Sequence, residues 1–96
     1  MTGATFEWDE RKNAENIRKH GVSFPLAQEA FLDQRRVIAR DTGHGGPEVR
    51  FYCIRRAGGG ILTVRFSCRR GVIRIIGAGY WRKGRRLYEK ENPLHP

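Results

Sequence analysis

Arginines inside β-rich segments are the side chains of this sequence best suited to chemistry on a polyanion. Arg65 and Arg74 each lie within an apolar run, and burying a guanidinium without a partner is costly. Because arginine matches the geometry of phosphate with paired hydrogen bonds, an anion bound across a sheet would satisfy both residues. Arg55, in a third such run, is expected to join them. The alternative is that these arginines form ion pairs within the chain, with Asp33, Asp41 or Glu48.

Aromatic rings and positive charges are interleaved near the C-terminus. The segment Tyr80-Trp81-Arg82-Lys83 is followed by Arg85. Rings of this kind stack on unpaired bases while Arg and Lys bind the nucleic-acid backbone. We therefore predict RNA contacts by four of these side chains: Tyr80, Trp81, Lys83 and Arg85. Trp81 and Tyr88 have an equally good structural explanation, which is packing of the last helix on the sheet.

RNA cleavage without a metal ion needs groups that transfer protons and groups that stabilise the charge of the phosphorane. His44, in a glycine-rich loop beside Asp41 and Glu48, is the best acid–base candidate, although a lone loop histidine is more often structural. Lys19 and His20 stand at the expected end of a helix, where we predict that both bind RNA; the alternative for His20 is that it caps the last carbonyl groups. As charge stabilisers we rank three arginines: Arg74, Arg65 and Arg82.

The sequence has no pattern typical of a metal or cofactor site. Gly77-Ala78-Gly79 is followed by Arg82 where a dinucleotide-binding motif requires a third glycine. Cys53 and Cys68 are too few ligands for a zinc site, and each lies in an apolar run where it is expected to pack in the core. We therefore predict neither a metal ion nor a cofactor.

The size and charge of the chain narrow the class of partner. Its 96 residues suffice for one domain with a modest core, and 19 Lys and Arg against 10 Asp and Glu give a net charge of +9. Such a charge points to nucleic acid, an acidic membrane surface or an acidic protein, with a generically basic, solvated surface as the alternative. Lacking a run of ~20 apolar residues and a signal pattern, the chain is expected to be cytoplasmic without membrane contact.

The hydrophobic pattern predicts a single α+β domain over residues 1–96. Asp9 is a suitable cap for a helix that stops at Gly21, and Ser23 for a second helix. Short glycine-containing gaps between three strand-like segments predict hairpins. The expected elements are a strand over Phe6–Trp8, helices over Glu10–His20 and Phe24–Leu32, strands over Arg36–Arg40, Arg50–Arg56, Ile61–Cys68 and Val72–Gly79, and a helix over Trp81–Asn92.

Helices grouped on one face of an antiparallel sheet of about four strands are the simplest assembly of these elements. Alternate residues of a strand point to opposite faces. The apolar set Leu62, Val64 and Phe66 is therefore expected to pack against the helices, and Leu26 among the helix residues that cover it. The open face would then expose three arginines together: Arg55, Arg65 and Arg74.

Three ordered groups of residues resemble the pattern of a known family. The opening group is Phe6–Lys12, Asn16 and Lys19–Phe24, continued by Ala27, Ala30, Phe31 and Asp33. The loop group is Asp41, His44, Glu48 and Arg50. The closing group is Arg70-Gly71, Ile73–Ile76, Ala78, Arg85 and Tyr88-Glu89. In this order and spacing, which span nearly the whole chain, they resemble the BrnT family of ribonuclease toxins from type II toxin–antitoxin systems.

The BrnT resemblance implies a RelE-like fold and a metal-independent endoribonuclease. It also implies neutralisation by an antitoxin of the BrnA kind, oligomers with that antitoxin, and binding of promoter DNA only as the toxin–antitoxin complex. The chain departs from the family pattern at Gly79, where members often carry arginine, and at Gly84, where glutamate is frequent. Two alternatives stay open: a nucleic-acid-binding protein without catalysis, and a protein whose basic face only docks an acidic antitoxin segment.

Overall fold

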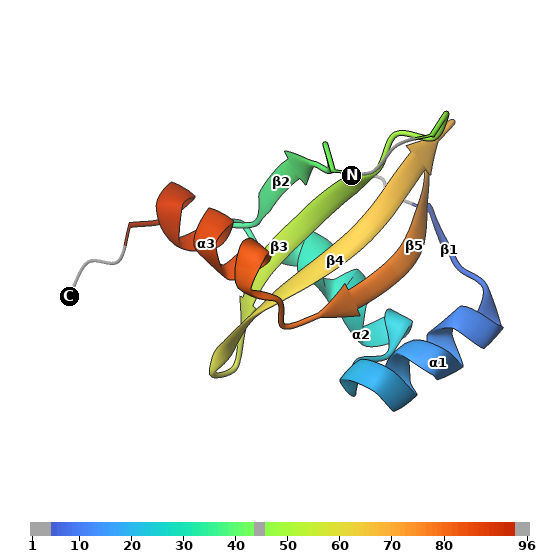
Figure 1. The fold of residues 1–96 in the computed structure, drawn as a ribbon, viewed down its shortest axis with the longest axis horizontal. Helices are drawn as coiled ribbons and strands as arrows, with labels where there is room; N and C mark the ends of the chain where they lie inside the picture. The colour runs from blue at the N-terminus through green and yellow to red at the C-terminus, as the bar shows by residue number, and fades with distance from the viewer. Residues whose placement is uncertain (1–4, 44–45, 94–96) are drawn as a thin grey trace.

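The computed structural model describes residues 5–43 and 46–93, and its α+β architecture is built on one five-stranded mixed sheet (Figure 1). In chain order the elements are β1 (Thr5–Glu7), α1 (Glu10–His20), α2 (Phe24–Gln28), the 3₁₀ turn η1 (Glu29–Leu32), β2 (Val37–Arg40), β3 (Phe51–Ala57), β4 (Gly60–Arg69), β5 (Val72–Gly79) and α3 (Arg82–Glu91). The predicted α+β class and order of elements are confirmed.

Helix α1 forms where the sequence predicts it because both of its ends carry local signals. The Asp9 carboxylate accepts a hydrogen bond from the backbone N–H of Arg11 at 2.8 Å, and this bond lowers the pKa of Asp9. Gly21 adopts the left-handed conformation with a φ of 71°, and its N–H donates to the carbonyl of Ile17 at 2.8 Å. The end of α1, and therefore the place of His20, is fixed by the glycine.

The second helix is shorter than predicted. Ser23 caps α2 as expected, but the α-helix ends at Gln28 and the chain tightens into η1. A helix of five residues turns only Phe24 and Ala27 fully inward. Leu26 is 45% exposed, so its predicted place in the core was wrong.

The sheet joins an antiparallel meander to a parallel edge strand. Strands β3, β4 and β5 are antiparallel neighbours, and β2 extends the meander beyond β3. At the other edge β1 runs parallel to β5 and places Glu7 opposite Arg74, 67 residues later in the chain. The prediction of an antiparallel sheet of about four strands was therefore incomplete. A parallel pairing between such distant segments leaves no turn signal in the sequence.

The helices lie on both faces of the sheet, contrary to the prediction that they share one face (Figure 1). On the face of α1 and α2, the main core is formed by Val22, Phe24, Ala27, Ala30, Cys53, Leu62, Val64, Phe66, Ile75 and Ala78. On the opposite face, called here the α3 face, a smaller core is formed by Tyr52, Ile54, Ile61 and Tyr88. The apolar face of β4 does pack against helices, as predicted, but α3 packs on the other side.

The cysteines differ in environment. Cys53 is fully buried, and burial raises the pKa of its thiol to about 12. Cys68 is exposed near the end of β4, so the expectation that both cysteines pack in the core was wrong for Cys68. Both thiols are free.

Candidate nucleic-acid interface

The register of the sheet separates the three strand arginines that were predicted to emerge together. Arg65 and Arg74 both point to the α3 face, where their side chains are 36% and 44% exposed. Arg55 pairs with Leu62 and therefore points to the opposite face, where it donates a hydrogen bond to the carbonyl of Glu29 at 3.3 Å. The prediction was wrong for Arg55 because the residue of β4 opposite it is Leu62, and paired residues of neighbouring strands point to the same face.

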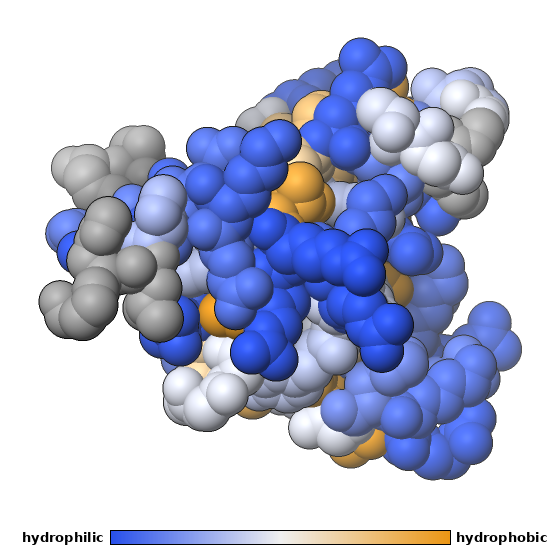
Figure 2. Space-filling view, turned by 60° about the vertical axis from the view of Figure 1, so that its left-hand side comes forward, coloured by the Kyte–Doolittle hydropathy of each residue, from blue (hydrophilic) through white to orange (hydrophobic). Residues whose placement is uncertain are grey.

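Helix α3 covers only part of its face of the sheet. It packs on β4, β3 and β2, while the strand end that carries Arg74 lies away from it (Figure 1). Hydrophilic side chains cover most of the molecule seen from the α3 end, and hydrophobic residues show only in small gaps between them (Figure 2). This side of the molecule is therefore strongly polar, and the grooves within it decide where a ligand would sit.

Side chains from two elements, β4 and α1, meet at the indole ring of Trp81, the residue before α3. The guanidinium carbon of Arg65, from β4, lies 5.9 Å from the centre of the ring, and the His20 ring, from the end of α1, meets it edge-on at 5.6 Å. These residues line a groove of about 440 Å³, called here the Trp81 groove, with Lys12, Glu15, Asn16, Lys19, Ile76 and Gly77. The groove combines a ring for stacking, cations, one histidine and one carboxylate, that of Glu15, which lies 3.8 Å from the Nζ of Lys19.

The missing side chain of Gly79 creates the place that Trp81 occupies. A Cβ atom at Gly79 would lie 2.6 Å from Cε2 of Trp81, so any larger residue there would push the indole away. The indole of Trp81 therefore covers the backbone of Gly79 and lies beside the guanidinium of Arg65.

Asn16 fixes α1 against the sheet and thereby places His20. It is only 7% exposed, its Nδ2 donates to the carbonyls of Val22 at 2.8 Å and of Ala78 at 2.9 Å, and its Oδ1 accepts from the N–H of Ala78 at 3.2 Å. Sequence reasoning gave Asn16 no structural role. The signal available in the sequence was the position of Asn16 on the helix. A polar residue that faces a sheet is expected to form hydrogen bonds there.

Arg65 is poorly partnered for a cation at the edge of the core. Its Nε is buried without a hydrogen bond among the described residues, and the nearest carboxylate oxygen, Oδ2 of Asp41, lies 3.8 Å away. Asp41 itself is buried and accepts a hydrogen bond from the N–H of Gly43 at 3.1 Å. The ion pair considered from the sequence thus exists, but it leaves hydrogen-bonding capacity on the guanidinium.

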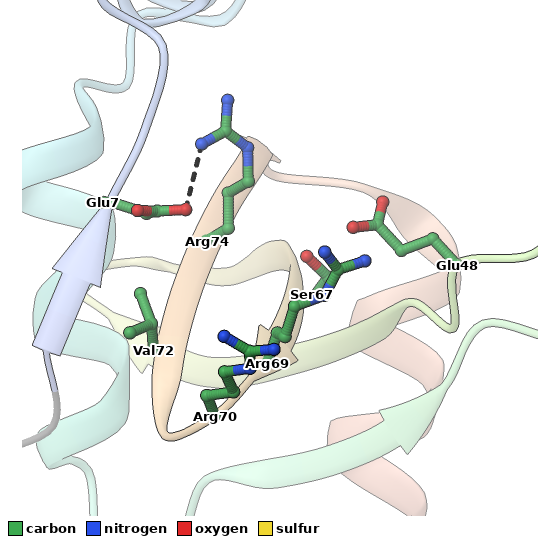
Figure 3. A pocket seen from close by; sticks show the side chains of 7 residues that line it. All are labelled: Glu7, Glu48, Ser67, Arg69, Arg70, Val72 and Arg74. Carbon is green, nitrogen blue, oxygen red and sulfur yellow. Dashed lines mark hydrogen bonds and ion pairs between the residues drawn. The ribbon is translucent and has the colours of Figure 1, made fainter.

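Arg74 lies in a second groove of about 460 Å³, called here the Arg74 groove, whose other lining residues are Glu7, Glu48, Ser67, Arg69, Arg70 and Val72 (Figure 3). Figure 3 shows the side chains of Arg74 and Glu7 pointing toward one another, and Nη1 lies 3.0 Å from Oε2. Arg74 therefore has a closer carboxylate partner than Arg65 does.

The remaining predicted residues are scattered. Tyr80 is 53% exposed and packs against Gly60 at the β3–β4 turn. Lys83 lies over the ring of Tyr52, with Nζ 5.4 Å from its centre, and Arg85 pairs with Glu89 at 3.1 Å. Arg82 is exposed at the start of α3, and Tyr88 packs in the smaller core. His44 lies outside the described residues.

Of the predicted residues, the structure brings Lys19, His20, Arg65 and Trp81 together in the Trp81 groove, and Lys83 lines an adjoining pocket with Arg65 and Trp81. Within residues 5–43 and 46–93, no group of three or more His, Cys, Asp and Glu side chains could hold a metal ion. Over the same residues, no helix has the length and apolar character needed to cross a membrane.

Comparison with known proteins gives one family. Residues 8–84 match the family model described as "Ribonuclease toxin, BrnT, of type II toxin-antitoxin system". No curated protein matches the chain significantly. The matched range contains α1, the whole meander and the first residues of α3, and therefore every lining residue of the Trp81 groove.

Proposed function

Because this chain belongs to the BrnT family of ribonuclease toxins from type II toxin–antitoxin systems, we propose that it is a metal-independent endoribonuclease that binds RNA in the Trp81 groove. The observation that carries the proposal is the convergence of Arg65 from β4, His20 from α1 and Trp81 from the start of α3. RNA cleavage without a metal requires charge stabilisation and proton transfer, and stacking of a base positions the RNA for both.

In this proposal Trp81 stacks on an unpaired base and Arg65 stabilises the charge of the phosphorane. Arg65 suits that role because its side chain is 36% exposed and its ion pair with Asp41 is long, at 3.8 Å. We place it before Arg74, whose guanidinium is already bound by Glu7 at 3.0 Å. Arg74 then contacts the RNA backbone farther along the same face.

His20 is the proton-transfer group that the groove offers, since its ring lies 5.6 Å from that of Trp81. His44, the candidate preferred from the sequence, remains a second proposal because the Asp41 end of its loop lies beside Arg65. Lys19, Arg82, Lys83 and Arg85 are proposed to bind the RNA backbone, and the exposed ring of Tyr80 to stack on a base. Their charge would hold RNA without selecting its sequence.

We also propose for this chain the fold, the antitoxin and the DNA binding that the family implies. The α+β order and the meander fit a RelE-like fold, and the basic surface fits an acidic segment of a BrnA-like antitoxin. Binding of promoter DNA is proposed only for the toxin–antitoxin complex. Co-expression with the neighbouring gene product, followed by co-purification and a DNA-binding assay, tests these relationships.

The central experiment is induced expression combined with cleavage by the purified chain in the presence of EDTA. We expect growth arrest in cells and RNA fragments in vitro that EDTA does not suppress. His20→Gln is expected to slow cleavage while leaving the melting temperature unchanged, because His20 is exposed. Cleavage that requires an added divalent ion would contradict the proposal.

The second candidate function is RNA binding without cleavage, and the geometry at Gly79 is the observation that favours it. The arginine that relatives often carry there is absent, and Trp81 covers its position. Salt-sensitive RNA binding by a chain that neither arrests growth nor cuts RNA would support this candidate.

A further inference from the structure

The start of α3 lacks the features that usually satisfy a helix N-terminus. The first N–H groups of a helix have no acceptor within it. In α1 and α2 a side chain of Asp9 or Ser23 accepts one of them, whereas α3 follows Trp81, and no side chain of the described residues caps it. Its first turn has no acidic residue and carries Arg82 and Lys83. The positive end of the helix dipole thus meets further positive charge.

A small pocket of about 170 Å³ opens beside this helix start, lined by Tyr52, Thr63, Arg65, Trp81, Lys83 and Gly84. We call it the α3 pocket. Its lining residues, all within the described part of the chain, include two cations and no carboxylate. The carboxylate that pairs with a lining residue is that of Asp41, whose Oδ2 lies 3.8 Å from the Nε of Arg65.

Thr63 gives a second, independent indication that the α3 pocket takes a ligand. The residue is 1% exposed, and its Oγ1 is buried without a hydrogen-bond partner among the described residues. That oxygen faces the first turn of α3, because a Cβ atom at Gly84 would overlap it. A buried hydroxyl without a partner is rare in proteins, and a bound acceptor would satisfy it.

We propose that the α3 pocket binds one phosphate group, held by first-turn N–H groups of α3, by the hydroxyl of Thr63 and by the ammonium group of Lys83. These donors are the kind that bind phosphate at helix N-termini. Arg65 and Trp81 line both this pocket and the Trp81 groove. Resting on the proposed function, the inference is that the phosphate belongs to RNA and adjoins the base stacked on Trp81.

Titration of the ¹⁵N-labelled full chain with inorganic phosphate, at constant ionic strength against chloride, tests the pocket without any cleavage. We expect saturable shifts of the Lys83 and Gly84 amide signals. Thr63→Val keeps the shape of the side chain without the hydroxyl, and should weaken phosphate binding about tenfold or more, since hydrogen bonds to charged groups are strong. Thr63→Ser keeps the hydroxyl and should bind within about threefold of the wild type.

Two controls keep the result interpretable. Ser67→Ala removes a buried hydroxyl of the same strand that lines the Arg74 groove instead, and should leave phosphate binding unchanged. Unchanged melting temperatures show that each variant is folded. Phosphate shifts that never saturate at Lys83 and Gly84, or wild-type affinity in a folded Thr63→Val chain, would overturn the proposed pocket.

An RNA arm separates the two sources of phosphate. Short single-stranded RNA should displace inorganic phosphate from the same two amides. Phosphate that stays bound while RNA saturates the Trp81 groove would show a site for free phosphate and overturn its assignment to RNA. Because the titration needs no enzymatic activity, absence of RNA cleavage would contradict the proposed function and leave the pocket intact, whereas cleavage without phosphate binding would do the reverse.

Discussion

The Trp81 groove and the Arg74 groove are similar in volume and both carry arginines of the α3 face, but their cations are partnered differently. Arg74 meets Glu7 at 3.0 Å, with Glu48 in the same groove. Arg65 has one carboxylate oxygen at 3.8 Å and a ring at 5.9 Å. A count of charges therefore does not locate a binding site. Binding capacity depends on which cations the protein has already neutralised.

The largest effect is expected from removing the charge at Arg65. Arg65→Gln should lower the rate of RNA cleavage by about 100- to 1000-fold, as loss of one donor to a developing negative charge does elsewhere. Arg74→Gln, the matched control in the other groove, should cost less than about tenfold, because Arg74 is held by Glu7. Single-turnover cleavage of one RNA measures both. A larger loss for Arg74→Gln would reverse the assignment of the two grooves.

Removing the ring of Trp81 should have the next largest effect. Trp81→Ala is expected to weaken RNA binding about 5- to 150-fold, since stacking of one base on an aromatic ring contributes about 1–3 kcal/mol. Trp81→Phe should retain most of the affinity. Binding of a fluorescent single-stranded RNA by each folded variant measures the change, and an equal loss for Ala and Phe would argue against stacking.

A side chain at position 79 should change the shape of the Trp81 groove without removing any of its charged groups. Gly79→Ala forces the indole of Trp81 to move, and overpacking of this kind costs about 1–3 kcal/mol of unfolding free energy. Combining it with Trp81→Ala should recover most of that stability, because the clash is removed. Urea denaturation of the two single variants and the double variant gives the coupling, and purely additive losses would contradict the predicted contact.

The smallest effect is expected from releasing Arg74. Glu7→Gln removes the carboxylate that occupies its guanidinium, and should raise RNA affinity a few-fold at low salt with little change in stability, because both side chains are about half exposed. The gain should disappear at high salt. Affinities at two salt concentrations measure it, and unchanged affinity at low salt would show that the Arg74 groove does not contact RNA.

The parts of the fold that local signals determine were predictable from the sequence. The Asp9 cap and the Gly21 stop define α1, and the glycine-containing turns define the meander. The parallel pairing of β1 was not predictable, because it joins segments that no short loop connects. The face chosen by α3 was missed for a related reason: it depends on the close approach of Gly84 to Thr63, a contact between distant residues.

The candidate site was predictable in its residue types but not in its grouping. Arg65, Trp81 and His20 were each singled out from charge, aromatic character or position at a helix end. Their convergence depends on Asn16 holding α1 to β5 and on the alternation of β4, which a linear pattern does not reveal. Arg55 is the clearest example, because a register that differs by one residue from the one assumed places it on the opposite face of the sheet.

The bond between Asn16 and Ala78 spans 62 residues, and this separation has a consequence for the chain while it is being translated. Helix α1 leaves the ribosome before β5, the strand on which it docks, and β5 is followed directly by the segment that contains Trp81. The surface proposed to bind RNA therefore cannot assemble on a growing polypeptide until β5 and Trp81 have been synthesised. We expect nascent chains arrested before Trp81 to be harmless to the message that encodes them.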